Sequence, residues 1–261
     1  MNNLYLYFSG TGNTKYVVKH LIELYEEDSN YLMKSIEDKT VDYSSLIEEA
    51  KVIFIAYPIH EGLLPHIMNE FLIEHKEHFR NKDIITVCSQ LIFSGDGAAL
   101  PVHILKEVNV NLLHGIHVNM PSNLTDFWFL PAKTVEKSTK KFKKADAKIA
   151  RVVSKINKGK KIRNGIRFYS WALGFFLQRA FTKHHYNRIR SDVKIHHDTC
   201  INCNKCVTVC PVDNLYSKDK KILVKDNCTI CYRCVNECPT QTISIITNHK
   251  PTKQYILKDY N

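Results

Sequence analysis

The sequence predicts an α/β protein with a doubly wound, five-stranded parallel sheet, followed by a small α+β domain that is rich in cysteine. Two observations carry this prediction. Strand-like apolar runs alternate with amphipathic helical runs over the first 120 residues, and eight of the nine cysteines lie between Cys200 and Cys238. Continuous apolar strands that are separated by helices are typical of a parallel sheet whose two faces are both buried.

Each element of the first domain follows from the spacing of its apolar residues. Continuous apolar runs predict strands at residues 4–8, 31–33, 52–57, 84–88 and 112–118. Apolar residues at helical spacing predict helices at residues 14–24, 44–50, 65–75 and 98–108. A Lys-rich amphipathic helix is expected at residues 134–157, where it closes the sheet domain.

Charged residues divide the chain into parts of opposite sign. The formal net charge is +11, yet residues 1–130 carry 9 Lys and Arg against 17 Asp and Glu, whereas residues 131–194 carry 19 against 3. From the charge, the elements and the cysteines we expect four parts. They are a first domain at 1–160, a basic aromatic linker helix at 161–190, a cysteine-rich domain at 191–246 and a tail at 247–261.

The basic middle of the chain has several open interpretations. Its lysines fit a solvated helix face, a docking surface for an acidic protein partner, or contact with an anionic membrane surface. Nucleic acid is not expected as a partner, because no known reading motif accompanies the charge. The aromatic run at residues 168–177 either packs between the two domains or presents an apolar face to a membrane or partner. Peripheral membrane contact is not the favoured interpretation.

The cysteines and the absence of sorting signals together indicate the compartment. No signal sequence is visible after Met1, and no run approaches the roughly 18 apolar residues of a membrane span. Crowded cysteines in a chain without an export signal indicate metal or redox chemistry rather than disulfides. We therefore expect a soluble, cytoplasmic protein, in which the isolated Cys88 is a core residue.

The loop after the first expected strand has the composition of a phosphate-binding turn at a helix N-terminus. Its residues are Ser9, Gly10, Thr11, Gly12, Asn13 and Thr14. Glycines let the backbone approach an anion, hydroxyls donate hydrogen bonds, and the helix end adds partial positive charge. The Lys of a nucleotide P-loop is missing, and Lys15 stands where a dinucleotide fingerprint has its third Gly. The loop therefore suits the terminal phosphate of a mononucleotide.

The eight clustered cysteines form an internal repeat. Each half reads C-x2-C-x2-C-x3-C-P, and the second begins 28 residues after the first. This is the ligand pattern of bacterial ferredoxins, in which the fourth Cys of each run ligates the other cluster. By that rule two [4Fe-4S] clusters are held, one by Cys200, Cys203, Cys206 and Cys238, the other by Cys228, Cys231, Cys234 and Cys210. Zinc is the main alternative, but two complete runs that end in Pro exceed what zinc needs.

The loop at residues 8–14 resembles the phosphate loop of the flavodoxins, which bind FMN. Residues 57–62 and 89–97 fall where that fold presents its flavin loops, at the carboxyl ends of strands three and four. The resemblance implies a phosphate site at residues 9–14 and a ring site formed by Tyr57, Pro58, Ile59, His60, Gln90, Phe93, Ser94, Gly95, Asp96 and Gly97. The family often has a tyrosine where His60 stands, so the candidates for ring stacking are Tyr57, His60, Phe93 and Trp128.

Together the two halves resemble the flavodoxin–ferredoxin fusion proteins of anaerobic metabolism. The resemblance implies an electron-transfer protein that passes single electrons between two [4Fe-4S] clusters and FMN, and on to a partner oxidoreductase. A partner with an acidic docking surface would match the basic segment. The alternative is a flavin-dependent reductase that acts directly on a small substrate with electrons supplied through the clusters. No nicotinamide fingerprint and no acid–base pair is evident near the flavin loops, and no catalytic residue is predicted.

Overall fold

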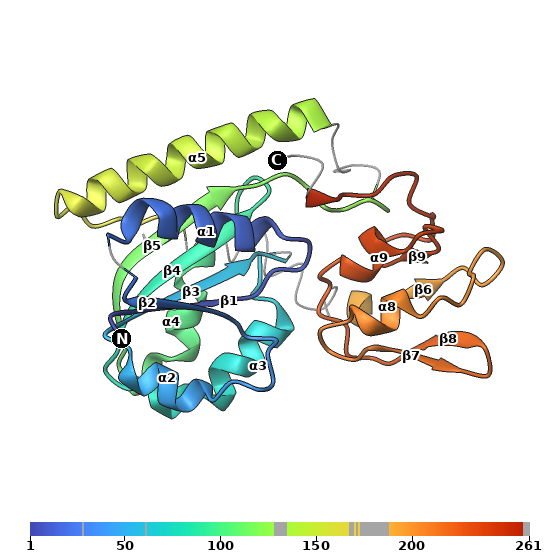
Figure 1. Cartoon of the computed structure of the whole chain (residues 1–261), viewed down its shortest axis with the longest axis horizontal. Helices are drawn as coiled ribbons and strands as arrows, with labels where there is room; N and C mark the ends of the chain where they lie inside the picture. The colour runs from blue at the N-terminus through green and yellow to red at the C-terminus, as the bar shows by residue number, and fades with distance from the viewer. Residues whose placement is uncertain are drawn as a thin grey trace.

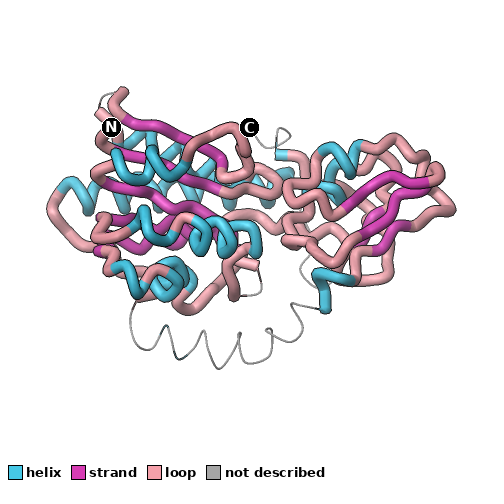
Figure 2. The backbone as a smooth tube through the Cα atoms, turned by 90° about the horizontal axis from the view of Figure 1, so that it is seen from below, coloured by secondary structure: helices cyan, strands magenta, loops and turns pink. Residues whose placement is uncertain are grey.

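A computed structural model of the chain describes residues 1–27, 29–60, 62–127, 135–166, 170, 172 and 188–257. A three-layer α/β domain forms the N-terminal part, and a smaller cysteine-rich domain lies beyond the carboxyl ends of its strands (Figure 1). Figure 2 shows the same two parts from below, with the strands of the large sheet running toward the small domain. The predicted fold class is confirmed.

The large sheet has five parallel strands in the order β2-β1-β3-β4-β5. They are β1 (Asn3–Tyr7), β2 (Tyr31–Ser35), β3 (Val52–Pro58), β4 (Asp83–Gln90) and β5 (Asn111–Asn119). Successive residues of β1 enter opposite cores, with Leu4 and Leu6 in one cluster and Tyr5 and Tyr7 in the other. The chain reverses its order of strand addition between β1 and β3, which is where a doubly wound sheet opens a binding crevice.

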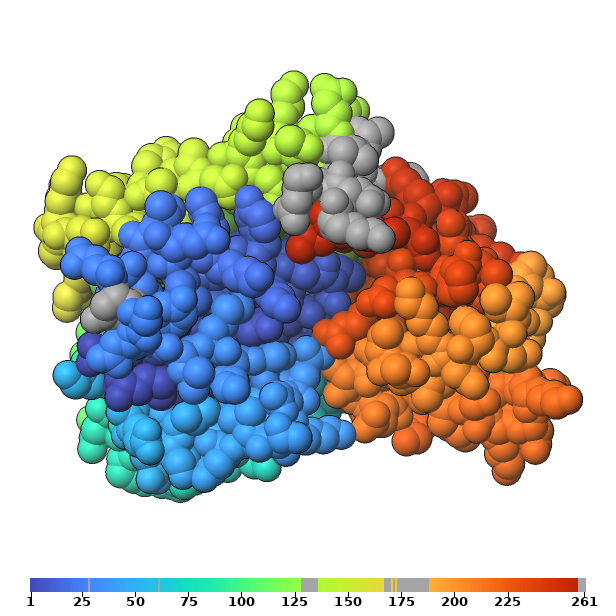
Figure 3. Space-filling model, in the orientation of Figure 1, coloured from blue at the N-terminus to red at the C-terminus, as the bar shows by residue number. Residues whose placement is uncertain are grey.

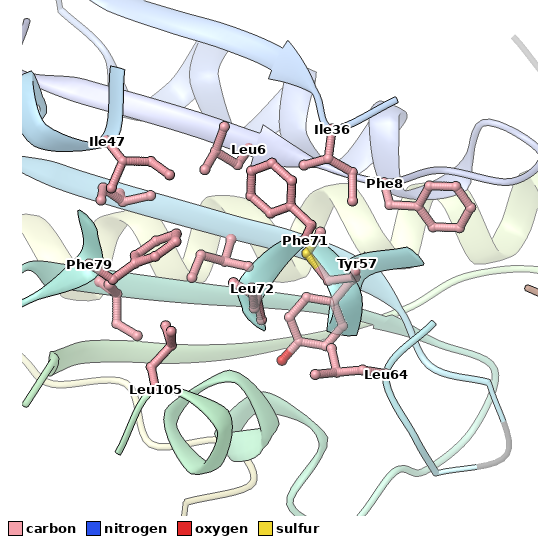
Figure 4. Packing of buried hydrophobic residues seen from close by; sticks show 14 of the residues in the cluster. Leu6, Phe8, Ile36, Ile47, Tyr57, Leu64, Phe71, Leu72, Phe79 and Leu105 are labelled. Atoms are coloured by element: carbon pink, nitrogen blue, oxygen red, sulfur yellow. The ribbon is translucent and has the colours of Figure 1, made fainter. Parts of the chain in front are cut away.

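Helices cover both faces of the sheet. One face carries α1 (Asn13–Tyr25) and α5 (Val135–Asn157), and the other carries α2 (Tyr43–Glu49), α3 (His66–Glu74), the 3-10 turn η1 (Lys76–Phe79) and α4 (Leu100–Ile104) (Figure 1). Figure 4 shows the core beneath α2 and α3, where Ile47, Phe71 and Leu72 meet Leu6 of β1. This packing follows from the amphipathic spacing of the helices.

The expected continuous helix at residues 98–108 is wrong. The segment is instead a 3-10 turn η2 (Gly97–Ala99), the short helix α4 and a second 3-10 turn η3 (Lys106–Val108). Pro101 stands in the first turn of α4 and lacks the backbone N–H that a longer helix would need there. The left-handed Asn109, with φ of 55°, ends η3.

The small domain consists of short elements around the cysteine runs. Strand β6 (Lys194–Ile195) pairs antiparallel with β9 (Ile243–Ser244), and β7 (Leu215–Lys218) forms a hairpin with β8 (Lys221–Val224). Each cysteine run contains one short helix, α8 (Lys205–Thr208) or α9 (Arg233–Glu237).

The sequence repeat of the small domain is also a repeat of backbone conformation. Three pairs of residues, each pair 28 positions apart, share the left-handed region: Asn202 with Ile230, Asn204 with Tyr232, and Asp213 with Gln241. Ile230 has φ of 56°, a conformation that β-branched residues rarely adopt, because its Cβ crowds the backbone. Such strain persists only where the surrounding structure holds it, and here the surrounding structure is the cysteine loop.

The chain after α5 returns to the edge of the large sheet. Gly115 of β5 donates its N–H to Ile162 O over 3.0 Å, and Asn164 donates to Gly115 O over 3.0 Å. The expected boundaries at 160, 190 and 246 stay predictions, and the aromatic run at 168–177 lies outside the described residues except for Ser170 and Ala172. No helix in the described part of the chain is long and apolar enough to cross a membrane.

Candidate redox site

The loop at residues 8–12 joins β1 to α1 and presents backbone donors at the helix N-terminus. Gly12 has φ of 100°, and Asn13 begins the helix. Within the described part of the chain, the backbone N–H groups of residues 10–14 have no hydrogen-bond acceptor. Five unsatisfied donors in one turn at a helix N-terminus fit an anion such as a phosphate. The FMN phosphate that the sequence predicts therefore fits this loop.

Neighbouring groups fix the shape of the loop. Lys15 N donates to Ser9 Oγ over 3.2 Å, and the hydroxyls of Thr14 and Ser89 lie 2.8 Å apart. The side chain of Asn13 donates to Pro121 O over 3.0 Å and accepts from the Tyr255 hydroxyl over 2.5 Å. Asn13 therefore offers its backbone N–H, rather than its amide side chain, to a phosphate.

A cavity of about 740 Å³ extends from this loop across the carboxyl ends of the strands. Its volume lies in the range of cofactor sites. Ten of the predicted flavin residues line it: Ser9, Gly10, Thr11, Asn13, Thr14, Pro58, Ile59, His60, Gln90 and Phe93. The structure thus brings the three predicted flavin loops to one cavity.

Six of the predicted flavin residues do not line this cavity: Gly12, Tyr57, Ser94, Gly95, Asp96 and Gly97. Tyr57 is fully buried in the core, and its hydroxyl donates to Gly97 O over 2.7 Å. Ser94 and Asp96 are buried as well, with the Ser94 hydroxyl donating to Gln90 Oε1. The reason is that the loop after β4 folds back onto the core after Phe93, so its second half supports the cavity wall from behind.

Two of the four ring-stacking candidates, His60 and Phe93, line the cavity. Tyr57 does not, and Trp128 lies outside the described residues. His60 Nδ1 lies 3.0 Å from Thr229 O, so this nitrogen carries the hydrogen and donates. Burial lowers the pKa of His60 to about 4, which keeps the imidazole neutral. A neutral His60 imidazole can form part of the cavity wall beside a flavin ring.

Several lining residues were missed by the sequence. Residues 120–124 and Phe127 follow β5, whose carboxyl end meets the same sheet edge, so topology alone could have indicated them. Ile230, Cys231 and Ile246 come from the small domain. No pattern in the sequence indicates these three, because their position depends on how the two domains pack.

The two cysteine runs enclose two cavities rather than a single-ion site. One cavity is lined by Cys200, Cys203, Cys206 and Cys238, and the other by Cys210, Cys228, Cys231 and Cys234. The fourth cysteine of each run thus lies with the first three of the other run, which supports the crossed ligand pattern. Among the described residues, no three His, Cys, Asp or Glu side chains are grouped as ligands of one metal ion.

Burial and backbone donors set the chemistry of these thiols. Burial, followed by repulsion from neighbouring thiols, raises the pKa of Cys231 to about 12 and that of Cys206 to about 11. Buried thiolates therefore need a cationic metal core beside them. Backbone N–H groups also point at sulfur, with Asn214 N 3.2 Å from Cys210 Sγ and Thr242 N 3.4 Å from Cys238 Sγ. Such hydrogen bonds tune the potential of a cluster, so the donor set fits iron–sulfur clusters.

The phosphate loop and the second cysteine run are in direct contact. A Cβ added to Gly10 would lie 2.2 Å from Cys231 O, so only glycine allows this approach. Arg233 extends from α9 into the large domain, where it donates to Ser9 O and Gly10 O over 2.9 Å each and pairs with Glu37 over 2.7 Å. Figure 3 shows the small domain packed directly against this side of the large domain.

A second set of bonds joins the domains through the loop after β5. Tyr232 donates its hydroxyl to Asp126 Oδ1 over 2.7 Å, and Asp126 Oδ2 accepts the N–H groups of Ile245 and Ile246 over 2.6 and 2.9 Å. The buried Asp126 therefore has its charge compensated by donors of the small domain. Asp126, Tyr232 and Ile245 are all buried, so the two domains pack tightly at these residues.

Comparisons with known proteins match both halves. A family model described as a flavodoxin domain matches residues 4–118, and one described as a 4Fe-4S dicluster domain matches residues 192–239. No curated protein matches the chain.

Similar solved structures include three flavodoxins. The protein from Megasphaera elsdenii has 15% identity and a TM-score of 0.41, with 59% of this chain and 98% of that chain covered. Flavodoxin 2 from Bacillus cereus has 14% identity and a TM-score of 0.43, with 61% and 99% covered. The Fusobacterium nucleatum flavodoxin bound to flavin mononucleotide has 16% identity and a TM-score of 0.41, with 62% and 100% covered.

The two domain types support an electron-transfer role that involves FMN and iron–sulfur chemistry. Their order along the chain is that of the predicted fusion, and the described contacts join the two domains at the phosphate loop. The chain carries a flavodoxin domain over residues 4–118 followed by a 4Fe-4S dicluster domain over residues 192–239, an arrangement that matches a flavodoxin–ferredoxin fusion.

Proposed function

We propose that this protein passes single electrons between two [4Fe-4S] clusters and one FMN, and on to a partner oxidoreductase. One observation carries the proposal: Cys231 lines both the flavin cavity and the second cysteine cavity. A flavin accepts one or two electrons and each cluster one, so cofactors that share a wall residue can exchange electrons one at a time.

The residues of the chain define an order for the three sites. Cys210, Cys228, Cys231 and Cys234 form the site next to the flavin, and Cys200, Cys203, Cys206 and Cys238 form the site farther from it. In the farther site Cys203 is exposed, as is 62% of the neighbouring Ile201. We therefore infer that electrons enter or leave the clusters at Cys203, and enter or leave the flavin near the exposed Phe93.

The test is the cofactor load of anaerobically purified protein. About one FMN and about eight iron atoms per chain are expected, from one phosphate loop and two complete cysteine runs. Bound zinc in place of iron, or a chain that holds iron but no flavin after incubation with FMN, contradicts the proposal.

The partner is proposed to carry an acidic surface that meets the basic face of α5. Lys140, Lys143 and Lys144 are exposed on this helix, whereas Lys141 turns back and lies 3.4 Å from Leu91 O, beside the flavin cavity. A cytoplasmic location is part of the same proposal, because cluster-forming thiols need a reducing compartment.

Direct reduction of a small substrate at the flavin is the second candidate. It is favoured by the rim of the flavin cavity, where Ile92 and Phe93 are 66% and 45% exposed. Steady turnover of a small molecule by the isolated protein would support it. Flavin oxidation that requires a second protein would favour the carrier instead.

A further inference from the structure

A second cavity, of about 450 Å³, lies beside the flavin cavity and shares Gln90 and Phe93 with it. Its walls bring together Lys148 of α5 with Lys161 and Arg163 from the segment after α5. None of the described residues that line it is acidic. A concave site whose charged side chains all have one sign favours a ligand of the opposite sign.

The backbone holds these cations in place. The bonds of Gly115 to Ile162 and Asn164 fix the strand-like segment that carries Lys161 and Arg163 to the edge of β5. Gly165, with φ of 69°, then passes so close to His117 that a Cβ would lie 2.5 Å from its ring. The sheet thus fixes the backbone from which the exposed side chains of Lys161 and Arg163 extend.

The three cations of the cavity have no acidic residue beside them among the described lining residues. Lys148 is half-buried and Lys161 and Arg163 are exposed, and within the described part of the chain none of their three side chains forms an ion pair or a hydrogen bond. Burial lowers the pKa of Lys148 from its ordinary value, because the charged ammonium loses water when it is half-buried.

His117 adds a neutral donor to the same wall. It is 7% exposed, and its Nε2 lies 3.1 Å from Ala98 N and accepts that N–H. Its hydrogen therefore sits on Nδ1, which has no acceptor among the described residues. The His117 donor, the half-buried Lys148 and the exposed Lys161 and Arg163 at one cavity match an anion with several acceptor oxygens.

The basic cavity continues along α5. A neighbouring cavity of about 570 Å³ shares Lys148, Lys161 and Arg163, and adds Arg151, Lys155 and Lys160 to its walls. The two cavities together form a cleft that begins at the flavin cavity and follows the second half of the helix. Its length exceeds what a single small ion would fill.

We propose that this cleft binds a phosphate-bearing small molecule of nucleotide size. Its phosphates contact Lys148, Lys161 and Arg163, and its organic end lies against Phe93 and Gln90 at the flavin cavity. A folded acidic partner fits less well, because the half-buried Lys148 lines a concave site. The phosphate contacts come from the chain itself, and only the placement beside the flavin rests on the proposed function.

The test is calorimetric titration of the cofactor-loaded protein with ADP and with pyrophosphate at about 0.15 M salt. Adenosine, which has no phosphate, serves as the control ligand. Saturable binding of ADP and pyrophosphate without binding of adenosine is expected. Absence of saturable binding of both phosphate ligands would overturn the proposal.

Paired variants locate the site. Lys161→Gln combined with Arg163→Gln should weaken ADP binding at least about tenfold, because two charge-assisted contacts are lost. Lys140→Gln combined with Lys143→Gln removes the same charge from the exposed face of α5 and should leave binding unchanged. Equal weakening in both pairs would show non-specific attraction and sink the proposed site. Iron and flavin contents of the same samples report separately on the proposed function.

Discussion

The guanidinium of Arg233 joins three parts of the molecule that are far apart in sequence. It donates to the phosphate-loop carbonyls, pairs with Glu37 after β2, and donates to Val209 O over 3.2 Å, one residue before Cys210. A lysine cannot make this set of contacts, because its donors radiate from one nitrogen rather than from a planar fork. One side chain therefore contacts the phosphate loop and lies between the two cysteine runs.

Arg233→Lys should weaken FMN binding about tenfold while iron content stays near normal. The phosphate loop loses charged hydrogen bonds worth about 1.5–3 kcal/mol, part of which the lysine restores. Release of flavin fluorescence on dilution measures the affinity. Lys39→Gln is the matched control, because it removes another ion pair between the domains, the one that Lys39 forms with Asp213. The side chains of Lys39 and Asp213 are 80% and 67% exposed, so this pair contributes little to stability. An equal loss of FMN affinity in the two variants would mean that the contacts of Arg233 with the phosphate loop do not support FMN binding.

His117 should make the protein less stable as the pH falls from about 6.5 to about 4. Burial, aided by Lys148, lowers its pKa to about 4 in the folded state, so the unfolded chain binds the proton first. The contribution is fully present above pH 6.5 and is lost on acidification.

His117→Gln keeps an acceptor for Ala98 N but cannot be protonated. Urea unfolding of wild type and variant, followed by circular dichroism at about pH 7 and about pH 5, measures the difference in the free energy of unfolding. The wild type should lose more stability than the variant over this interval. Parallel losses in both proteins would show that His117 does not titrate differently in the folded state.

At the scale of elements, the small domain is two copies of one loop-and-helix unit. Each copy turns through left-handed residues at matching positions and places its fourth cysteine in the other cavity. The copies differ in setting: Cys203 is exposed at the outer site, whereas Cys231 belongs to the buried core of the large domain. The two cysteine sites therefore differ in access to solvent although their sequences repeat.

Cys210→Ser and Cys238→Ser should damage different clusters. Cys210 stands in the first run, but its change should alter the cluster of Cys228, Cys231 and Cys234, next to the flavin, while Cys238→Ser alters the outer one. Electron paramagnetic resonance of the reduced proteins distinguishes the two sites. Loss of the signal from the run in which each substitution lies would contradict the crossed pattern.

At the scale of the whole molecule, the excess of positive charge lies in residues 131–194, which include α5. The basic face of α5 is on the same side of the sheet as α1, and the small domain extends from the carboxyl edge (Figure 1). The proposed acidic partner would approach the flavin cavity on binding α5, because Lys141 of this helix lies 3.4 Å from Leu91 O, at the cavity wall.

Lys140→Gln, Lys143→Gln and Lys144→Gln together should slow association with an acidic redox partner and flatten its dependence on salt. Surface charges steer encounter, and salt screens them over about 8–10 Å. Stopped-flow association rates at several ionic strengths provide the measurement. Three glutamines in place of Lys218, Lys220 and Lys221 on the β7–β8 hairpin are the control. An association rate that is the same in the α5 variant and the wild type would show that these lysines form only a solvated helix face.

The sequence predicted those features of this protein that depend on short-range spacing. The order of strands and helices follows from apolar periodicity, the loop at residues 9–14 from glycine and hydroxyl composition, and the two cysteine runs from their repeat. The expected continuous helix at 98–108 is wrong because Pro101 lacks the backbone N–H that a helix through this position needs. Residues 94–97 were predicted to form part of the flavin site, but they do not line the cavity, because the loop folds back onto the core after Phe93.

Only the tertiary structure decided which residues of the two domains contact one another. The contact of Gly10 with Cys231 and the contacts of Arg233 with Ser9 and Gly10 join residues more than 200 positions apart. Local propensity and spacing carry no information about such pairs, since the geometry comes from packing two separately patterned domains. Spacing along the sequence also does not predict the basic cleft. Lys148 and Arg163 line one cavity because the chain after α5 pairs with the edge of β5.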